Sequence, residues 1–134
     1  MMLRYMLDTN ICIYAIKNRP AEVREKFNQQ ADRLCISTVT LTELLYGAEK
    51  SATPARNLGV VESFVARLKV LPFDERAASH TAQMRALLEK TGQPIGSCDT
   101  MIVGHARSLG LTVVTNNLRE FARVPGLLME NWVG

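Results

Sequence analysis

The sequence of 134 residues predicts an α/β protein, a three-layer α/β/α sandwich built on a mainly parallel sheet. Short apolar segments alternate with longer segments of helical periodicity along most of the chain. Single prolines, glycines and capping residues separate these segments, and no repeat or flexible linker interrupts them. Parallel strands joined by helices are covered on both faces. We therefore expect a single domain over residues 1–134.

The first half of the chain contains two expected strands, each followed by helices. Residues 3–8 and 34–36 are short and apolar, as buried strands are. Thr9 or Asn10 can cap the helix after the first strand, and Ser37 or Thr38 can cap the helix after the second. Prolines suit the first turn of a helix, which favours two further helix starts. The helices expected here are 11–18, 20–30, 38–51 and 54–68.

The second half continues the same alternation. Asp74 caps a long helix that ends near Gly92, and Gly110 ends another helix. Residues 111–115 form the clearest strand because they are rich in β-branched side chains. A short helical turn is expected to end at Phe121. The remaining elements expected are strands 70–73 and 127–129 and a helix over 98–109.

The composition is that of an ordinary globular protein, with 47% apolar and 22% charged residues. Sixteen Lys and Arg against 13 Asp and Glu give a net charge of +3, which permits an anionic partner without requiring one. The three cysteines lack the close spacing of zinc sites, and no apolar run is long enough to span a bilayer. We expect a reduced, cytoplasmic protein without a membrane segment.

Three acidic residues are expected at the same edge of the sheet. Asp8 ends the first strand, and Glu43 and Asp99 follow the starts of later helices. The carboxyl ends of parallel strands meet at one edge, where α/β folds bind their ligands. Converging carboxylates repel one another unless a cation lies between them. The sequence therefore predicts a metal site.

Each acid also has a simpler explanation. Asp8 could cap a helix, and Glu43 lies opposite the apolar stripe of its helix, as a solvent-exposed carboxylate would. Asp99 lies on the apolar stripe of its own helix, with no Lys or Arg beside it, although it could act as a cap. Glu120 could pair with a neighbouring arginine on the surface. Spacing alone favours function for Asp99 and opposes it for Glu43.

Four segments in order resemble the PIN-domain ribonucleases, above all the VapC toxins of bacterial toxin–antitoxin operons. The resemblance extends in register over nearly the whole chain. The segments are Met-Leu-Asp-Thr-Asn at 6–10, Ser-Thr-Val-Thr-Leu-Thr-Glu-Leu at 37–44, Asp-Thr-Met-Ile-Val-Gly-His-Ala at 99–106, and Val-Val-Thr-Asn-Asn at 113–117 with Glu-Phe at 120–121.

The resemblance implies a metal-dependent active site and assigns residues to it. Asp8 and Asp99 would bind the metal, Mg²⁺ or Mn²⁺, and Glu43 would join them in catalysis. Glu120 would assist catalysis through water, or Asn117 would form a hydrogen bond at the site in its place. The polar side chains expected to orient the carboxylates are Thr9, Asn10, Thr115, Asn116 and Asn117.

The resemblance also implies an activity and partners. The expected enzyme is a metal-dependent endoribonuclease that cuts RNA, such as tRNA, with metal-activated water and so inhibits translation. The expected partners are a VapB-like antitoxin, a second copy of the chain, and operator DNA bound through the antitoxin. The helix after Thr53 has two apolar stripes, and we expect the stripe of Val60 and Phe64 to contact a partner.

Two other functions deserve comparison. A receiver-like signalling domain also gathers acids and Mg²⁺ at a parallel sheet edge, but it needs an acceptor Asp at the end of a central strand and a Lys after the last strand. Here Asp99 opens a helix and Thr115 is followed by Asn. A ribonuclease that uses His80 and His105 as acid and base is the other alternative.

Overall fold

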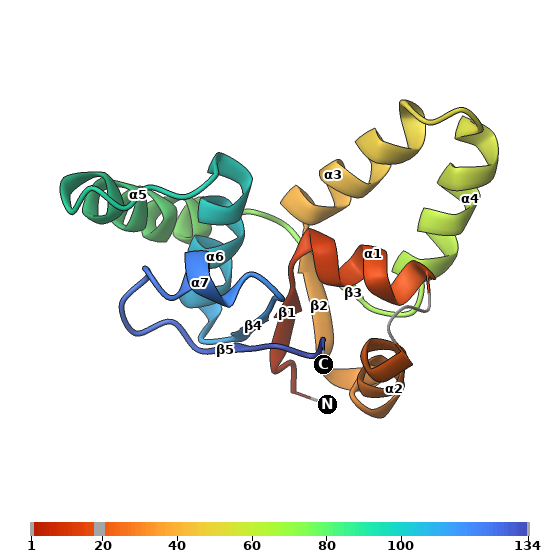
Figure 1. The fold of residues 1–134 in the computed structure, drawn as a ribbon, viewed down its shortest axis with the longest axis horizontal. Coiled ribbons are helices and arrows are strands. Elements are labelled where there is room, and N and C mark those ends of the chain that lie inside the picture. Colours follow the sequence, from red (N-terminus) through yellow and green to blue (C-terminus); the bar gives the residue numbers. More distant parts are fainter. Residues whose placement is uncertain (1, 18–20, 134) are drawn as a thin grey trace.

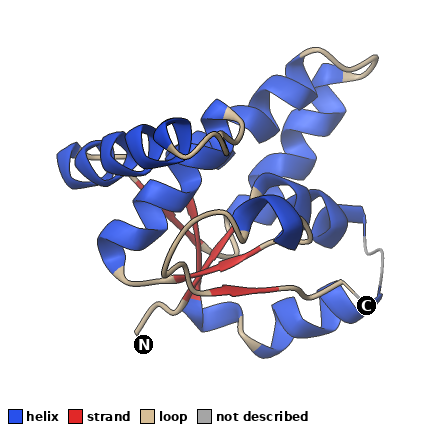
Figure 2. Cartoon of the chain, turned by 60° about the vertical axis from the view of Figure 1, so that its left-hand side comes forward, coloured by secondary structure: helices blue, strands red, loops and turns tan. Residues whose placement is uncertain are grey.

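The computed structural model describes residues 2–17 and 21–133, which form a five-stranded sheet with helices on both faces (Figure 1). The strands are all parallel, in the order β3-β2-β1-β4-β5. Figure 2 shows the strands enclosed between helices above and below, as the sequence predicts. The strands are β1 (Tyr5–Leu7), β2 (Leu34–Ser37), β3 (Lys69–Leu71), β4 (Thr112–Val114) and β5 (Met129–Glu130).

Seven α-helices and one short 3₁₀ helix connect and cover these strands in the described residues. The bounds of the α-helices lie within a few residues of those expected, except that the end predicted at Asn18 and the start predicted at Pro20 fall outside the described residues, and the 3₁₀ helix was not predicted. The helices are α1 (Thr9–Lys17), α2 (Ala21–Gln29), η1 (Ala31–Arg33), α3 (Thr38–Glu49), α4 (Pro54–Val65), α5 (Glu75–Lys90), α6 (Ser97–Leu109) and α7 (Leu118–Phe121).

The sheet has a core on each face because successive side chains of a strand point to opposite sides. Tyr5 and Leu7 of β1 pack with residues of α1, α2, α3 and α4, whereas Met6 packs with residues of α5 and α6. All three residues of β1 are buried, as expected of a strand with neighbours on both sides. Packing in both cores holds β1 in place, and β1 in turn positions the functional side chains.

Local signals in the sequence explain most helix ends. Ser37 and Asp74 accept hydrogen bonds from the backbone N–H groups of Val39 and Ala77, which caps α3 and α5. Gly110 ends α6 in a left-handed conformation, with φ of 67°. Thr53 precedes α4 as expected, but its side chain makes no capping hydrogen bond.

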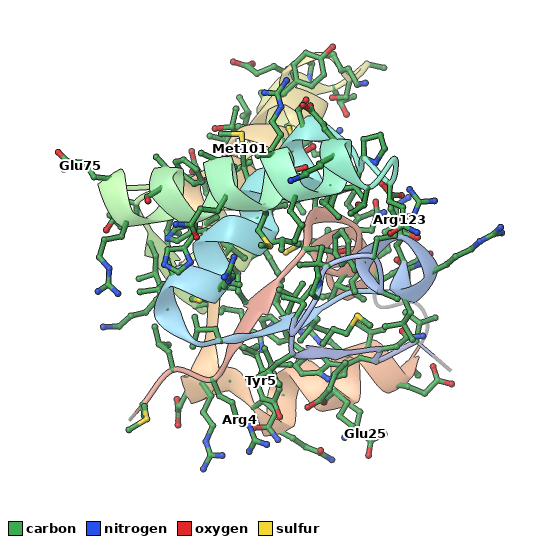
Figure 3. All side chains as sticks on the ribbon, turned by 90° about the vertical axis from the view of Figure 1, so that its left-hand side faces the viewer. Arg4, Tyr5, Glu25, Glu75, Met101 and Arg123 are labelled. Carbon is green, nitrogen blue, oxygen red and sulfur yellow. The ribbon has the colours of Figure 1, made fainter. Side chains whose placement is uncertain are left out.

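The strands end at one edge of the sheet, and the helices that follow them begin there. Figure 3 shows Tyr5, at the start of β1, low in the view and Met101, in the first turns of α6, well above it. The helix α6 leads directly into β4, which pairs in parallel with β1, so α6 runs opposite to both strands and begins at the carboxyl end of β1. In the described part of the chain, no helix has the length and apolar character needed to cross a membrane.

Candidate active site

Asp8 lies immediately after β1 and is almost completely buried, with 3% of its surface exposed. Its Oδ1 atom accepts a hydrogen bond of 2.8 Å from the backbone N–H of Ile11, so Asp8 caps α1. The expectation that Thr9 or Asn10 is the cap is wrong. Burial raises the pKa of Asp8, hydrogen bonds from Thr115 and Ile11 lower it, and Glu43 raises it again.

Glu43 lies in the second turn of α3, half-buried, and accepts a hydrogen bond from the Thr9 hydroxyl. The helical wheel predicts an exposed carboxylate, but α3 contacts both cores of the molecule. Leu44 belongs to one core, and Val39 packs against the other. The side of α3 opposite its main stripe therefore faces the edge of the sheet, where Asp8 lies.

Asp99 lies in the first turn of α6 and is the acid most affected by the others. Its pKa rises to about 6 because of burial first, and then because of the negative charges of Glu120, Asp8 and Glu43. The charges of Glu120, Asp8 and Glu43 all act on Asp99, so the four carboxylates lie within electrostatic range of it.

Glu120, in α7, is held by two hydrogen bonds. Its Oε2 atom accepts from the Asn117 side chain at 2.8 Å, and Oε1 accepts from the backbone N–H of Gly96 at 3.3 Å. Glu120 and Asn117, the two alternatives for the fourth position of the site, are hydrogen-bonded to each other. The hydrogen bond from Gly96 could not be predicted from the sequence, because a backbone N–H group is common to nearly all residue types.

The other polar residues expected at the site differ in their burial and in their hydrogen-bond partners. Thr115 is fully buried and accepts a hydrogen bond of 2.9 Å from the backbone N–H of Asn117. Asn116 donates to the hydroxyl of Tyr14 at 3.0 Å, a contact between residues 102 apart in the sequence. Asn10 is exposed on α1, and its side chain makes no hydrogen bond within the described residues.

No Lys, Arg or His of the described residues forms an ion pair with these acids. Across residues 2–17 and 21–133, the only ion pair is an exposed one between Arg85 and Glu89. Nor are three His, Cys, Asp or Glu side chains of this part already grouped as a preformed metal site. Glu43 accepts a hydrogen bond from Thr9, and Glu120 accepts hydrogen bonds from Asn117 and Gly96.

The donors nevertheless fit a hard divalent cation. All four are carboxylates, and Mg²⁺ and Mn²⁺ prefer oxygen ligands. The raised pKa values of Asp8 and Asp99 mean that their charged forms lack compensation, which a cation would provide. Burial and crowding of uncompensated acids mark a functional site more often than a structural one.

The surface expected for a partner is only partly free. Val60 of α4 is 40% exposed, but Phe64 is 5% exposed and its ring lies 5.3 Å from that of Phe27. The expectation that Phe64 faces outward is wrong, because both stripes of α4 have buried members. Val61 of the first stripe lies with Phe64 in the core beside α2 and α3.

Comparison with known proteins identifies the family of the chain. The model of the PIN domain family matches residues 5–127. The chain is 60% identical over 131 residues to the tRNA(fMet)-specific endonuclease VapC of Salmonella typhimurium, covering 98% of this chain and 99% of that protein. It is 53% identical over 132 residues to ribonuclease VapC2 of Haemophilus influenzae, covering 98% and 100%.

Solved structures give the same result. The DNA-bound VapBC structure from Salmonella typhimurium matches with a TM-score of 0.94 at 60% identity, over 98% of this chain and 99% of that chain. The promoter-bound VapBC2 structure from Rickettsia felis matches with a TM-score of 0.91 at 37% identity, over the same shares. The chain therefore belongs to the PIN-domain family and, within it, to the VapC ribonucleases, the toxins of VapBC toxin–antitoxin systems.

This family assignment confirms the expected ribonuclease and disfavours both alternatives. Asp99 opens α6, unlike the strand-end acceptor of a receiver domain. His105 is 2% exposed, so its imidazole is not available to act on RNA.

Proposed function

We propose that the chain is a divalent-metal-dependent endoribonuclease that uses Asp8, Glu43, Asp99 and Glu120. The observation that supports this most is the raised pKa of Asp99, caused after burial by the other three carboxylates, none of which forms an ion pair within residues 2–17 and 21–133. These acids come from segments between residues 8 and 120, so we propose that residues 1–134 act as one nuclease domain.

Each residue has a distinct role in this mechanism. Asp8 and Asp99 would hold Mg²⁺, or Mn²⁺, which when bound would lower the pKa of a coordinated water and offset negative charge on the phosphate. The hydrogen bond from the backbone N–H of Ile11 fixes the Asp8 carboxylate. Thr9 orients Glu43, and Asn117 orients Glu120.

The substrate we propose is tRNA. The Salmonella relative, at 60% identity, is named for cleavage of tRNA(fMet). Attack by water, rather than by the neighbouring 2′-hydroxyl, would leave a 5′-phosphate and a 3′-hydroxyl. Cleavage of tRNA would inhibit translation, and we place this activity in the cytoplasm.

Cleavage assays on total cellular RNA test the nuclease. We predict cleavage with Mg²⁺, none in excess EDTA, and new ends bearing a 5′-phosphate. Asp8→Asn and Asp99→Asn should lower the rate by more than about 100-fold, since loss of groups that only support metal ligands costs 10–100-fold. Asn at position 8 can still cap α1. Asp32→Asn, in the exposed turn before β2, is the control and should cut normally. Full activity in EDTA would exclude this mechanism.

The partner we propose is a VapB-type antitoxin, as in the VapBC structures of Salmonella typhimurium and Rickettsia felis. A groove of about 320 Å³ lies between α1, α3 and α4. Its lining joins apolar side chains to the site acid Glu43 and to Lys17, which suits an apolar segment that also carries charged side chains. The apolar lining residues used in this argument are Ile13, Leu44 and Val60. We also propose a homodimer, and operator DNA bound through the antitoxin.

Val60→Glu tests this groove. A charge there should weaken capture of the cognate antitoxin by at least about 10-fold, because burying an unpaired charge in an apolar interface costs several kcal/mol. Cleavage by the free toxin should not change. Leu128→Glu is the matched control, since Leu128 is 60% exposed and lies outside the groove. Equal capture of both variants would show that the antitoxin binds elsewhere.

A further inference from the structure

His105 is a buried polar residue that the nuclease mechanism does not use. It lies in α6 with 2% of its surface exposed, and its Nδ1 atom is 2.8 Å from the Oγ atom of Ser37. Ser37, also fully buried, is the last residue of β2 and the cap of α3. Burying an imidazole in an apolar interior costs free energy unless its nitrogens are hydrogen-bonded. Ser37 provides the hydrogen-bond partner of Nδ1.

The direction of this hydrogen bond follows from the other contacts of Ser37. Its oxygen already accepts a hydrogen bond of 3.1 Å from the backbone N–H of Val39. The hydroxyl proton is therefore free to be donated to Nδ1 of a neutral imidazole, which carries its own proton on Nε2. Burial lowers the pKa of His105, with a smaller opposing effect of Asp74, and so favours this neutral form.

This hydrogen bond joins the two helices that carry facing acids of the site. Ser37 begins the helix of Glu43, and His105 lies in the helix of Asp99. Figure 1 shows α3 and α6 on either side of the upper end of β1. Other pairs of segments are tied by direct bonds: α1 to α3 through Thr9, and α7 to the start of α6 through Glu120. The bond from Ser37 to His105 connects α3 with α6.

A second contact reinforces the same position. The backbone N–H of Phe73, which follows β3, donates to the Thr38 hydroxyl at 3.0 Å. The Phe73 ring meets the imidazole edge-on, with centroids 5.6 Å apart and an interplanar angle of 86°. The start of α3 is thus fixed against α6 by one side-chain hydrogen bond and by aromatic packing.

We propose that His105 is a positioning residue of the nuclease, which sets the separation of Glu43 and Asp99 by holding the Ser37 cap of α3 against α6. This inference rests on the proposed metal-dependent function. Glu43 lies beside the proposed ligands Asp8 and Asp99, and its negative charge supports Mg²⁺ there only if it stays at a fixed distance from them, so a loosened α3 weakens metal binding before RNA binding.

Substitutions at both partners distinguish positioning from packing. His105→Asn keeps an acceptor close to the place of Nδ1, whereas His105→Gln shifts it and His105→Leu removes it. Ser37→Thr keeps the hydroxyl, and Ser37→Ala removes it. Phe73→Leu is the packing control, because it disturbs the contact with the imidazole but leaves the hydrogen bond in place.

The measurements are Mn²⁺ affinity by titration calorimetry, single-turnover cleavage of RNA, and KM, all well below the unfolding temperature of each variant. His105→Leu and Ser37→Ala should bind Mn²⁺ about 10-fold more weakly and lose cleavage rate with little change in KM. His105→Asn and Ser37→Thr should stay within about 3-fold of the wild type, and so should Phe73→Leu.

Two outcomes would overturn the role of His105. The first is wild-type Mn²⁺ affinity in folded His105→Leu and Ser37→Ala. The second is an equal loss of affinity in Phe73→Leu, which would show that packing alone is responsible. A wild-type protein that binds no Mn²⁺ and cuts no RNA would instead contradict the proposed function itself.

Discussion

Asp99 is the residue whose carboxyl is affected by the negative charges of the three other acids of the site. Its carboxyl has a pKa of about 6, against an ordinary value of 3.8, because of burial and then of three neighbouring carboxylates. A raised pKa of an acid means that the folded state binds the proton more tightly than the unfolded state does. The metal-free protein is therefore destabilised once this proton is lost.

The sign of this effect gives a pH-dependent prediction. As pH rises from about 4 to about 6, the unfolded carboxyl ionises first, so the free energy of unfolding falls. We expect a loss of about 1–2 kcal/mol, which is the shift converted at 1.36 kcal/mol per unit and reduced for partial exposure to solvent. In the absence of metal, Asp99→Asn should remove this loss and be more stable than the wild type above pH 6.

Urea unfolding in EDTA at several pH values measures this difference. The stability of Asp99→Asn relative to the wild type should grow from pH 4 to pH 6 and then level off. Asp32→Asn, an exposed acid away from the site, should follow the wild type. Parallel stability curves for Asp99→Asn and the wild type would contradict the proposed crowding of charges.

At the scale of the elements, α6 is positioned by an unusually close contact with α5. A Cβ atom at Gly104 would overlap the Thr81 hydroxyl and lie 2.6 Å from its Cα atom and 2.7 Å from its backbone nitrogen. Only glycine allows this approach of the two backbones. The contact fixes α6, and with it Asp99, against α5.

Gly104→Ala should therefore destabilise the protein by about 1–3 kcal/mol, the usual cost of overpacking, although Ala is the better helix former. The matched control is Gly59→Ala in α4, where a Cβ would meet nothing within 4 Å. This control should be neutral or stabilising by up to about 1 kcal/mol. Thermal unfolding of both variants measures the difference, and equal midpoints would show that α5 and α6 can move apart.

The elements were predictable to different degrees. Helix caps and β-branched segments are local signals, so Asp74, Gly110 and the strand at Thr112–Val114 could be predicted. The sequence also predicts Asp99 as an inward-pointing acid, because it interrupts an apolar stripe. Partnerships between distant residues have no local signal, which is why the bonds of His105 with Ser37 and of Asn116 with Tyr14 could not be predicted.

Two predictions failed for a common reason. A helical wheel compares side chains with one apolar stripe, but α3 and α4 each contact more than one neighbour. Glu43 lies away from the main stripe of α3 and still faces the site, and Phe64 lies on the second stripe of α4 and is still buried. A wheel predicts the outer face correctly only for a helix with a single partner layer.

For the whole molecule, the site links four segments that are far apart in the sequence, so metal binding should stabilise the entire fold. A ligand that binds only the folded state adds about 2.7 kcal/mol at a concentration 100 times its Kd. We predict that Mn²⁺ raises the unfolding midpoint of the wild type and not that of Asp8→Asn. The fluorescence of Trp132, the single tryptophan and 4% exposed, can report this transition. Equal shifts in both proteins would place the ion elsewhere.

The distribution of the thiols has a practical consequence. Cys12 and Cys35 are buried, whereas Cys98 is exposed next to Asp99. Partial burial and the negative charge of Glu43 raise the pKa of the Cys98 thiol, so maleimide coupling there calls for mildly alkaline solution. The native protein thus offers one chemical handle beside its acids, where an attached fluorophore would report ion and nucleotide occupancy without engineered cysteines.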